Sequence, residues 1–295
     1  MSEHKNEFEP LPWQRSHLGY EGRFVEDVLV NLPNGNTVRV SQTANPLQKG
    51  NKGTKSKGKK SDKKGSSGKD LDALDDDPAA TGTTVWDCGI LLPQYLNCCL
   101  NDTAHNPFAG LQLQLPLDKC IELGCGTGVA SICLAAHGKL AKSYTLTDIP
   151  VCVSHIQGNV DKNLSLFNTP GVVVQVAPLS WGNEAHVHAL PIKAPFDLII
   201  GTDVIYYDAE IDQIKTLLEA ITHLAGPSTV VFLALDKQHA PKSVDLFVQT
   251  VAAGGLWRDV MNMSAKVPRD LITGTAVVLR LSGFVGAKGH KGRRN

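Results

Sequence analysis

Short apolar runs recur along most of the chain and alternate with segments in which apolar residues repeat every three or four positions. The runs predict buried strands, and the spaced repeats predict helices with one buried face. Strands of continuous apolar character are typical of parallel sheets that helices cover on both faces. The pattern therefore predicts an α/β fold with a doubly wound, mostly parallel, seven-stranded sheet. Its strands are expected at 119–123, 143–147, 172–176, 196–201, 229–235, 257–263 and 276–281.

Helical spacing is clearest in three of the intervening segments. In the first of them, one buried face is expected to consist of Val153, Ile156, Val160 and Leu164. The corresponding positions are Ile211, Ile214, Leu217, Leu218 and Ile221 in the second segment, and Val244, Phe247, Val248 and Val251 in the third.

The N-terminal part of the chain follows a different pattern. Asn34-Gly35 separates two runs with alternating valines, which predicts a β-hairpin within 23–42. Residues 48–70 contain no Ala, Val, Leu, Ile, Met or aromatic residue, and such a segment cannot bury enough apolar surface to offset its chain entropy. We therefore divide the chain into an N-terminal segment with the hairpin (1–43), a disordered Lys-rich then Asp-rich linker (44–80), a main domain (81–285) and a basic tail (286–295).

The overall composition excludes several classes of protein. The chain is 42% hydrophobic and 20% charged, which is ordinary for a globular protein and excludes a wholly disordered or fibrous chain. No run approaches the roughly 18 apolar residues that a membrane-spanning helix needs. The first residues lack the apolar stretch of a signal peptide, so we expect an intracellular protein.

The net charge of zero is a cancellation between segments. Residues 49–69 hold nine lysines and one acidic residue, five aspartates lie between 70 and 77, and four basic residues lie in the last eight. The rest of the chain carries 16 basic and 23 acidic residues. We expect a mildly acidic globule with two basic segments, of which the lysine tract is the one feature that would bind nucleic acid.

Candidate chemistry lies after the first two strands of the expected sheet. The first strand runs into Glu122-Leu-Gly-Cys-Gly-Thr-Gly128, and the second ends at Asp148. Ligands of such sheets bind beyond the carboxyl ends of the strands, where glycines let the backbone approach a ligand and a carboxylate can accept ribose hydroxyls. A dinucleotide-binding GxGxxG would need glycine at Val129, so the pattern argues against NAD. The seven cysteines include no CxxC pair, and no metal site is predicted.

Three further motifs narrow the interpretation. They are Val85-Trp86-Asp87 before an amphipathic helix, Trp181-Gly182 after the third strand, and Asp203-Val-Ile-Tyr206 after the fourth. With these motifs, the region from about 83 to 251 resembles the seven-β-strand S-adenosylmethionine (SAM)-dependent protein-lysine methyltransferases of the DxxY type. The resemblance is greatest to the branch that methylates valosin-containing protein. It implies a Rossmann-like methyltransferase sheet and SAM-dependent transfer of a methyl group to a protein lysine.

The chain departs from the pattern of that family in two places that bear on the structure and the substrate. Pro93 lies inside the expected helix after Trp86, where it should remove one backbone hydrogen bond and kink the helix. Asp236-Lys-Gln stands where relatives tend to carry a Glu-x-Arg-like segment, which leaves the substrate open.

The resemblance also implies a role for each matching residue. The cofactor would be S-adenosyl-L-methionine, bound by Trp86, Gly124, Cys125, Gly126, Asp148, Trp181 and Thr202. The two tryptophans would form flat apolar walls, and the backbone of Gly124, Cys125 and Gly126 would lie beside the methionine part. Asp203 and Tyr206 would be the catalytic residues, because a carboxylate can hold the incoming ammonium while an aromatic ring aligns the lysine.

The implied partner is a protein substrate such as an AAA ATPase, a chaperone or a translation factor, with no membrane partner. The implied location is cytoplasmic, and also nuclear if the basic tract acts in targeting. A nucleic-acid or small-molecule N-methyltransferase on the same fold remains open, as does a non-catalytic interaction protein. Val204 and Ile205 stand where enzymes that methylate bases carry prolines, which argues against a flipped base.

Overall fold

The seven-stranded sheet predicted from the apolar runs is present in the computed structural model, which describes residues 25–42, 82–102, 104–168, 171–206, 211–238, 240–272 and 274–286. The strand order is β5-β4-β3-β6-β7-β9-β8. Pairing is parallel from β5 through β7, while β9 is antiparallel to both of its neighbours. The strands are β3 (Leu117–Leu123), β4 (Ala141–Asp148), β5 (Val173–Pro178), β6 (Leu198–Thr202), β7 (Val230–Asp236), β8 (Trp257–Asn262) and β9 (Ala276–Phe284).

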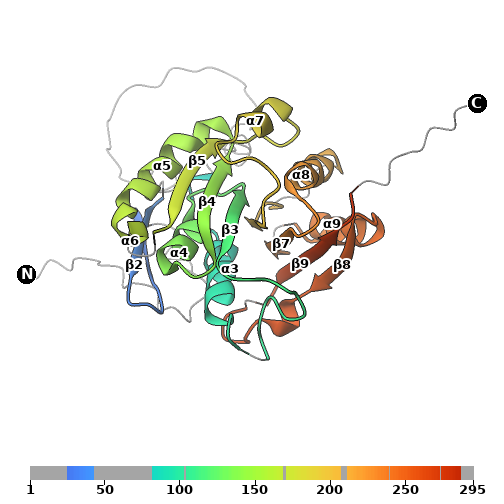
Figure 1. The fold of residues 1–295 in the computed structure, drawn as a ribbon, viewed down its shortest axis with the longest axis horizontal. Helices are drawn as coiled ribbons and strands as arrows, with labels where there is room; N and C mark the ends of the chain where they lie inside the picture. The colour runs from blue at the N-terminus through green and yellow to red at the C-terminus, as the bar shows by residue number, and fades with distance from the viewer. Residues whose placement is uncertain are drawn as a thin grey trace, which may run out of the picture.

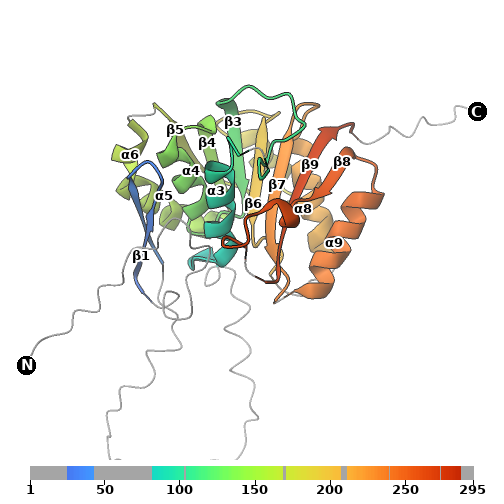
Figure 2. The same cartoon turned by 90° about the horizontal axis from the view of Figure 1, so that it is seen from below.

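Helices cover both faces of this sheet, as Figures 1 and 2 show. They are α3 (Asp87–Cys98), α4 (Val129–His137), α5 (Val153–Lys162), α6 (Leu164–Asn168), α7 (Glu184–Ala189), α8 (Ile211–Leu224) and α9 (Pro241–Ala253), with short 3-10 turns η3 (Pro150–Cys152) and η4 (Ser264–Lys266). Successive strand residues point to opposite faces, so Cys120 joins the core layer under α3, α4 and α5, whereas Ile121 joins the layer under α8 and α9. The expected α/β architecture is confirmed. None of the described helices is long and apolar enough to cross a membrane.

The strand order places a topological switch point at β3. Its neighbours are β4 on one side and β6 on the other, and Leu123 pairs with Thr147 of β4 and with Gly201 of β6. The carboxyl ends of these three strands therefore lie at one edge of the sheet, where ligands of doubly wound folds bind.

The predicted hairpin consists of β1 (Asp27–Asn31) and β2 (Thr37–Ser41), which pair in antiparallel register. Its four valines are fully buried. Two asparagine side chains of the α5 region hold β2, because Asn159 Oδ1 accepts the Ser41 amide at 2.8 Å and Asn163 Oδ1 accepts the Arg39 amide at 3.0 Å. The hairpin is thus an integral part of the layer that contains α5.

Gln42 links the hairpin to the segment before α3. Its Nε2 donates to the Val25 carbonyl at 2.8 Å, and its Oε1 accepts the Val85 amide at 3.1 Å. Residues 43–81 lie outside the described residues, and the proposed disordered linker (44–80) falls wholly within this range. Most of the proposed basic tail also lies outside the described residues.

One detail differs from the sequence-based expectations. Leu164 is 50% exposed, because α5 ends at Lys162 and Leu164 begins the separate helix α6. Asn163 produces that break: its Nδ2 donates to the Asn159 carbonyl and so takes the place of a further helical amide. The predicted proline lies where it was expected, because Pro93 is inside α3 and the residues on either side of it are buried.

Candidate functional site

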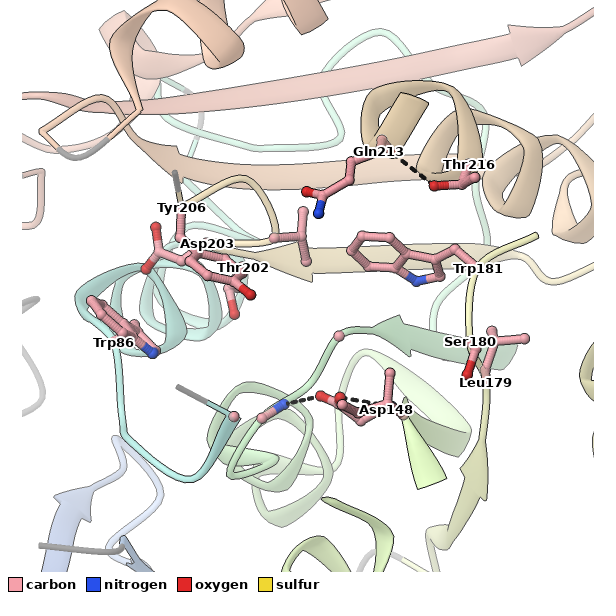
Figure 3. A pocket seen from close by; sticks show the side chains of 15 residues that line it. Trp86, Asp148, Leu179, Ser180, Trp181, Thr202, Asp203, Tyr206, Gln213 and Thr216 are labelled. Carbon is pink, nitrogen blue, oxygen red and sulfur yellow. Dashed lines mark hydrogen bonds between the residues drawn. The ribbon is translucent and has the colours of Figure 1, made fainter. Parts of the chain in front are cut away.

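One cavity of about 350 Å³ opens at the carboxyl ends of β3, β4 and β6, and its size is that of a site for a small ligand. Figure 3 shows Asp148 facing Trp181 across it, with Trp86, Thr202, Asp203 and Tyr206 gathered at one end. Of the nine predicted site residues, eight line the cavity, namely Trp86, Gly124, Gly126, Asp148, Trp181, Thr202, Asp203 and Tyr206.

Cys125 is the predicted residue that the structure does not bring into the cavity. Its side chain is 5% exposed and packs in the core, and its backbone amide donates to the Thr147 carbonyl at 3.0 Å. The prediction concerned the Cys125 backbone rather than its side chain, and in the structure the two glycines on either side line the cavity while Cys125 does not.

Glycine is required at two positions of this loop because neighbouring groups lie against the backbone. A Cβ on Gly124 would lie 3.2 Å from the Trp181 ring and 3.1 Å from Val204. A Cβ on Gly126 would lie 3.2 Å from the Gly82 carbonyl oxygen, and Gly126 also has φ of +56°. The loop is therefore enclosed by the indole on one side and by the segment before α3 on the other.

Asp148 fixes the loop from the end of β4. Its Oδ2 accepts the Gly126 amide and its Oδ1 accepts the Ile149 amide, both at 2.7 Å. Burial raises the pKa of this carboxyl, while those two backbone donors act in the opposite direction. The Cys152 thiol is a third hydrogen-bond donor to this carboxylate. A carboxylate has about four acceptor sites, so it can hold the loop and still accept a hydroxyl group from a ligand.

Asp203 also joins two elements by hydrogen bonds to their backbone, a role that no local sequence pattern indicated. Its Oδ2 accepts the Cys88 amide and its Oδ1 accepts the Asp236 amide, both at 3.0 Å. The residue adopts φ of +51°, a conformation that aspartate tolerates better than most side chains. Burial raises the pKa of the Asp203 carboxyl to about 6, so the group is still ionised at neutral pH.

The two helices that begin beside the cavity share an unusual form of capping. Trp86 and Gly128 occupy the N-cap positions of α3 and α4, and neither supplies a side-chain cap. Asp203 caps α3 from the loop after β6, and Glu122 of β3 caps α4 by accepting the Ser131 amide at 3.0 Å. Because these carboxylates come from strand ends, a tryptophan and a glycine can occupy the cap positions nearest the ligand.

Sequence reasoning missed seven further residues that line the cavity. They are Gly82, Ile149, Leu179, Ser180, Val204, Gln213 and Thr216. Ile149, Leu179, Ser180 and Val204 adjoin predicted site residues, so their neighbours were an available signal. Gln213 and Thr216 lie on α8, where the helical pattern identified only the buried apolar face. Within the described part of the chain, no cluster of His, Cys, Asp or Glu side chains is arranged to hold a metal ion.

Glu122 provides a test of the capping arrangement. Burial raises the pKa of its carboxyl from 4.5 to about 7, and its Oε1 has no partner among the described groups. Between these two pKa values the folded state binds more protons than the unfolded state, so this group makes the free energy of unfolding fall as pH rises from 4.5 to 7. The full cost, on the order of 3 kcal/mol, applies above pH 7.

We therefore expect Glu122→Gln to flatten the dependence of melting temperature on pH. The glutamine Oε1 still accepts the Ser131 amide, but it carries no buried charge. The variant should match the unsubstituted protein at pH 5 and exceed it at pH 8, as measured by differential scanning calorimetry. Glu219→Gln, at an exposed position of α8, is the control. Parallel curves for Glu122→Gln and the unsubstituted protein would contradict this account.

Comparisons with known proteins agree with the region that forms the cavity. A family model described as lysine methyltransferase matches residues 66–252, a range that includes every cavity-lining residue. EEF1A lysine methyltransferase 3 of Mus musculus is 32% identical over 163 residues, which are 55% of this chain and 59% of that protein. Protein N-lysine methyltransferase METTL21A of Mus musculus is 31% identical over 150 residues, 51% and 58% of the two chains. The chain thus spans less than two thirds of the length of these relatives.

Among solved structures, N-methyltransferase NodS from Bradyrhizobium japonicum WM9 in complex with S-adenosyl-L-homocysteine is one match. It is 16% identical, has a TM-score of 0.40, and is matched over 72% of this chain and 90% of its own.

Proposed function

The chain belongs to the lysine methyltransferase family, and on that premise we propose that it transfers a methyl group from SAM to a lysine side chain of a protein substrate. The observation that carries the proposal is one cavity that joins the Asp148-anchored glycine loop to Asp203 and Tyr206. Asp148 and the glycine loop suit an adenosyl ligand, and Asp203 and Tyr206 suit a cationic amine.

The residues present fit SAM. Asp148 lines the cavity with acceptor capacity left for a ribose hydroxyl, Gly124 and Gly126 present backbone without side chains, and Trp86 and Trp181 supply flat apolar surfaces. When bound, SAM supplies a methyl group on a positively charged sulfur, which an uncharged amine can accept without a covalent enzyme intermediate.

Asp203 and Tyr206 would act on the incoming lysine. The Asp203 carboxylate is held in place by two backbone amides from α3 and β7, so its negative charge has a fixed position at the cavity wall. A lysine with the ordinary pKa of about 10.4 arrives as an ammonium, which this charge attracts, and it must lose a proton before attack. A carboxyl with a pKa of about 6 is a much weaker base than the lysine amine, so we assign Asp203 to alignment of the amine rather than to proton removal. Tyr206, at the same end, would pack against the lysine stem.

The substrate protein is a finer part of the proposal. A translation elongation factor is the first candidate, because relatives about one third identical are named EEF1A lysine methyltransferase 3. Valosin-containing protein, an AAA ATPase, is the second, on the sequence motifs alone, and a chaperone is the third. All three would be met in the cytoplasm, where we propose that the protein acts, and also in the nucleus if the basic tract acts in targeting.

The experiment is a transfer reaction with labelled SAM, in a cell lysate and on purified candidate substrates. We expect label in protein, resistant to nuclease and recovered as methyl-lysine after acid hydrolysis. Purified EEF1A, valosin-containing protein and a chaperone, assayed side by side, rank the three candidates. Label that nuclease removes, or that passes a small-molecule filter, would replace the proposal with one of the two alternative acceptors on the same fold. A protein that binds no SAM and transfers no label would leave the non-catalytic interpretation.

A further inference from the structure

The wall of the cavity after β5 is a short loop whose shape depends on bonds made outside the cavity. Leu179, Ser180 and Trp181 form this wall. The Leu179 amide donates to the Asp148 carbonyl at 2.7 Å, which fixes the start of the loop. The Asn183 amide donates back to the Ser180 carbonyl at 3.1 Å, which closes the turn.

The Ser180 amide is held by a side chain rather than by backbone. It donates to Nδ1 of His186 at 3.0 Å. An imidazole nitrogen accepts a hydrogen bond through its lone pair, so this contact uses the tautomer of His186 that carries its proton on Nε2. His186 itself does not line the cavity.

Helix α7, which carries His186, packs only lightly on the domain, and Val187 is its hydrophobic contact with the core. It spans six residues, and none of them is buried. Its N-cap, Asn183, accepts the His186 amide through Oδ1 at 3.2 Å, so the backbone of His186 is fixed at the start of the helix. The helix thereby presents the imidazole to the loop at a defined position.

We infer that His186 is a positioning residue for the cofactor end of the cavity. By accepting the Ser180 amide, its imidazole holds the 179–181 wall in the shape that the ligand meets. The inference rests on the proposed function, since it assigns the wall to SAM. It concerns a residue that touches neither cofactor nor substrate.

Three variants separate this role from a general contribution to stability. His186→Ala removes the acceptor. His186→Asn restores one, because Asn Oδ1 and His Nδ1 are both bonded to Cγ and occupy nearly the same place. His188→Ala removes an exposed imidazole two residues further along the same helix and is the matched control.

The first readout needs no cofactor. Hydrogen exchange of a peptide covering 179–183 is measured in the ligand-free proteins at pH 8, where an ordinary imidazole is neutral. We expect faster exchange of one amide in His186→Ala and exchange like that of the unsubstituted protein in His186→Asn and His188→Ala. Unchanged exchange in His186→Ala would overturn the inference.

The second readout is the dissociation constant for S-adenosylhomocysteine by titration calorimetry. We expect about a fivefold weaker affinity in His186→Ala, the usual effect of one lost hydrogen bond, and affinities within about twofold of the unsubstituted protein in the other two. In steady-state assays the KM for SAM should rise by the same factor while kcat stays constant. Equal weakening in His186→Ala and His186→Asn, with both folded, would overturn the inference alone. An unsubstituted protein that does not bind S-adenosylhomocysteine would contradict the proposed function itself.

Discussion

Gly126→Arg is expected to abolish SAM binding while the domain remains folded. Gly126 has φ of +56°, and a Cβ there would lie 3.2 Å from the Gly82 carbonyl. A long side chain would therefore have to displace the segment before α3 or extend into the cavity that both residues line. The left-handed backbone costs a non-glycine residue roughly 1–2 kcal/mol, which a domain of this size can tolerate. Calorimetric titration with SAM measures the binding, and the melting temperature shows whether the domain is folded.

Gly171→Arg is the matched control for this change. Gly171 has a similar φ of +67°, but a Cβ there would meet nothing within 4 Å, and it precedes β5 at the edge of the sheet opposite the cavity. The control should carry the same backbone cost and keep full affinity for SAM.

Asp148→Ala is expected to have the same consequence by a different route. It removes the acceptors of the Gly126 and Ile149 amides together with the proposed acceptors of the ribose hydroxyls. Each buried amide left without a partner costs about 1–3 kcal/mol, so a lower melting temperature should accompany the loss of binding. Unchanged affinity in both Gly126→Arg and Asp148→Ala would end the assignment of this cavity to SAM.

Asp203→Asn is expected to reduce transfer to a protein lysine by at least tenfold, about 1.4 kcal/mol of transition-state stabilisation. The substitution removes the charge that holds the ammonium. It also places an amide N–H against either the Cys88 or the Asp236 amide, because an asparagine has one acceptor oxygen where the carboxylate has two. We therefore expect a fall of a few degrees in melting temperature and a small loss of SAM affinity, since Cys88 lies two residues from Trp86.

Asp236→Asn separates these two effects. It removes one negative charge at the end of β7 without removing an acceptor of the Cys88 amide, and Asp236 does not line the cavity. Transfer by this variant should stay within about threefold of the unsubstituted rate, a change of under about 1 kcal/mol. A normal rate in Asp203→Asn, with the acceptor mapped to a group other than lysine, would contradict the lysine assignment and leave the cofactor site unaffected.

The parts of the fold that were predictable are those in which the local pattern and the tertiary environment agree. Strands β6 and β7 are buried on both faces and almost wholly apolar, and most of the other strands contain a shorter apolar run. The seven strands were therefore located within a few residues of their observed ends. Leu164 shows where this agreement ends. Its spacing matched the buried face of α5, but Asn163 ends the helix through its own hydrogen bonds, and Leu164 turns to solvent.

Site residues could be predicted where a motif lies in one stretch of the sequence. Contacts between residues that are far apart in the sequence could not. Asp203 was identified from its motif, yet its bonds to Cys88 and Asp236 span 115 and 33 residues, which no spacing rule reports. For the same reason His186 stood in a short polar helix without any signal. From the sequence, Gln213 and Thr216 could not be distinguished from the solvent-exposed face of α8, because polar residues suit both a cavity wall and a solvated surface.

The described contacts that hold the hairpin on the domain do not require the chain to be continuous between them. β2 is fastened by Asn159 and Asn163, and Gln42 joins Val25 to Val85 by side-chain bonds alone. None of these contacts depends on the peptide bonds of residues 43–81. A chain divided within that interval would therefore keep every described contact of the hairpin, and its two pieces would form a heterodimer whose integrity follows the law of mass action. The hairpin thus binds the rest of the domain as a ligand would, although both belong to the same chain.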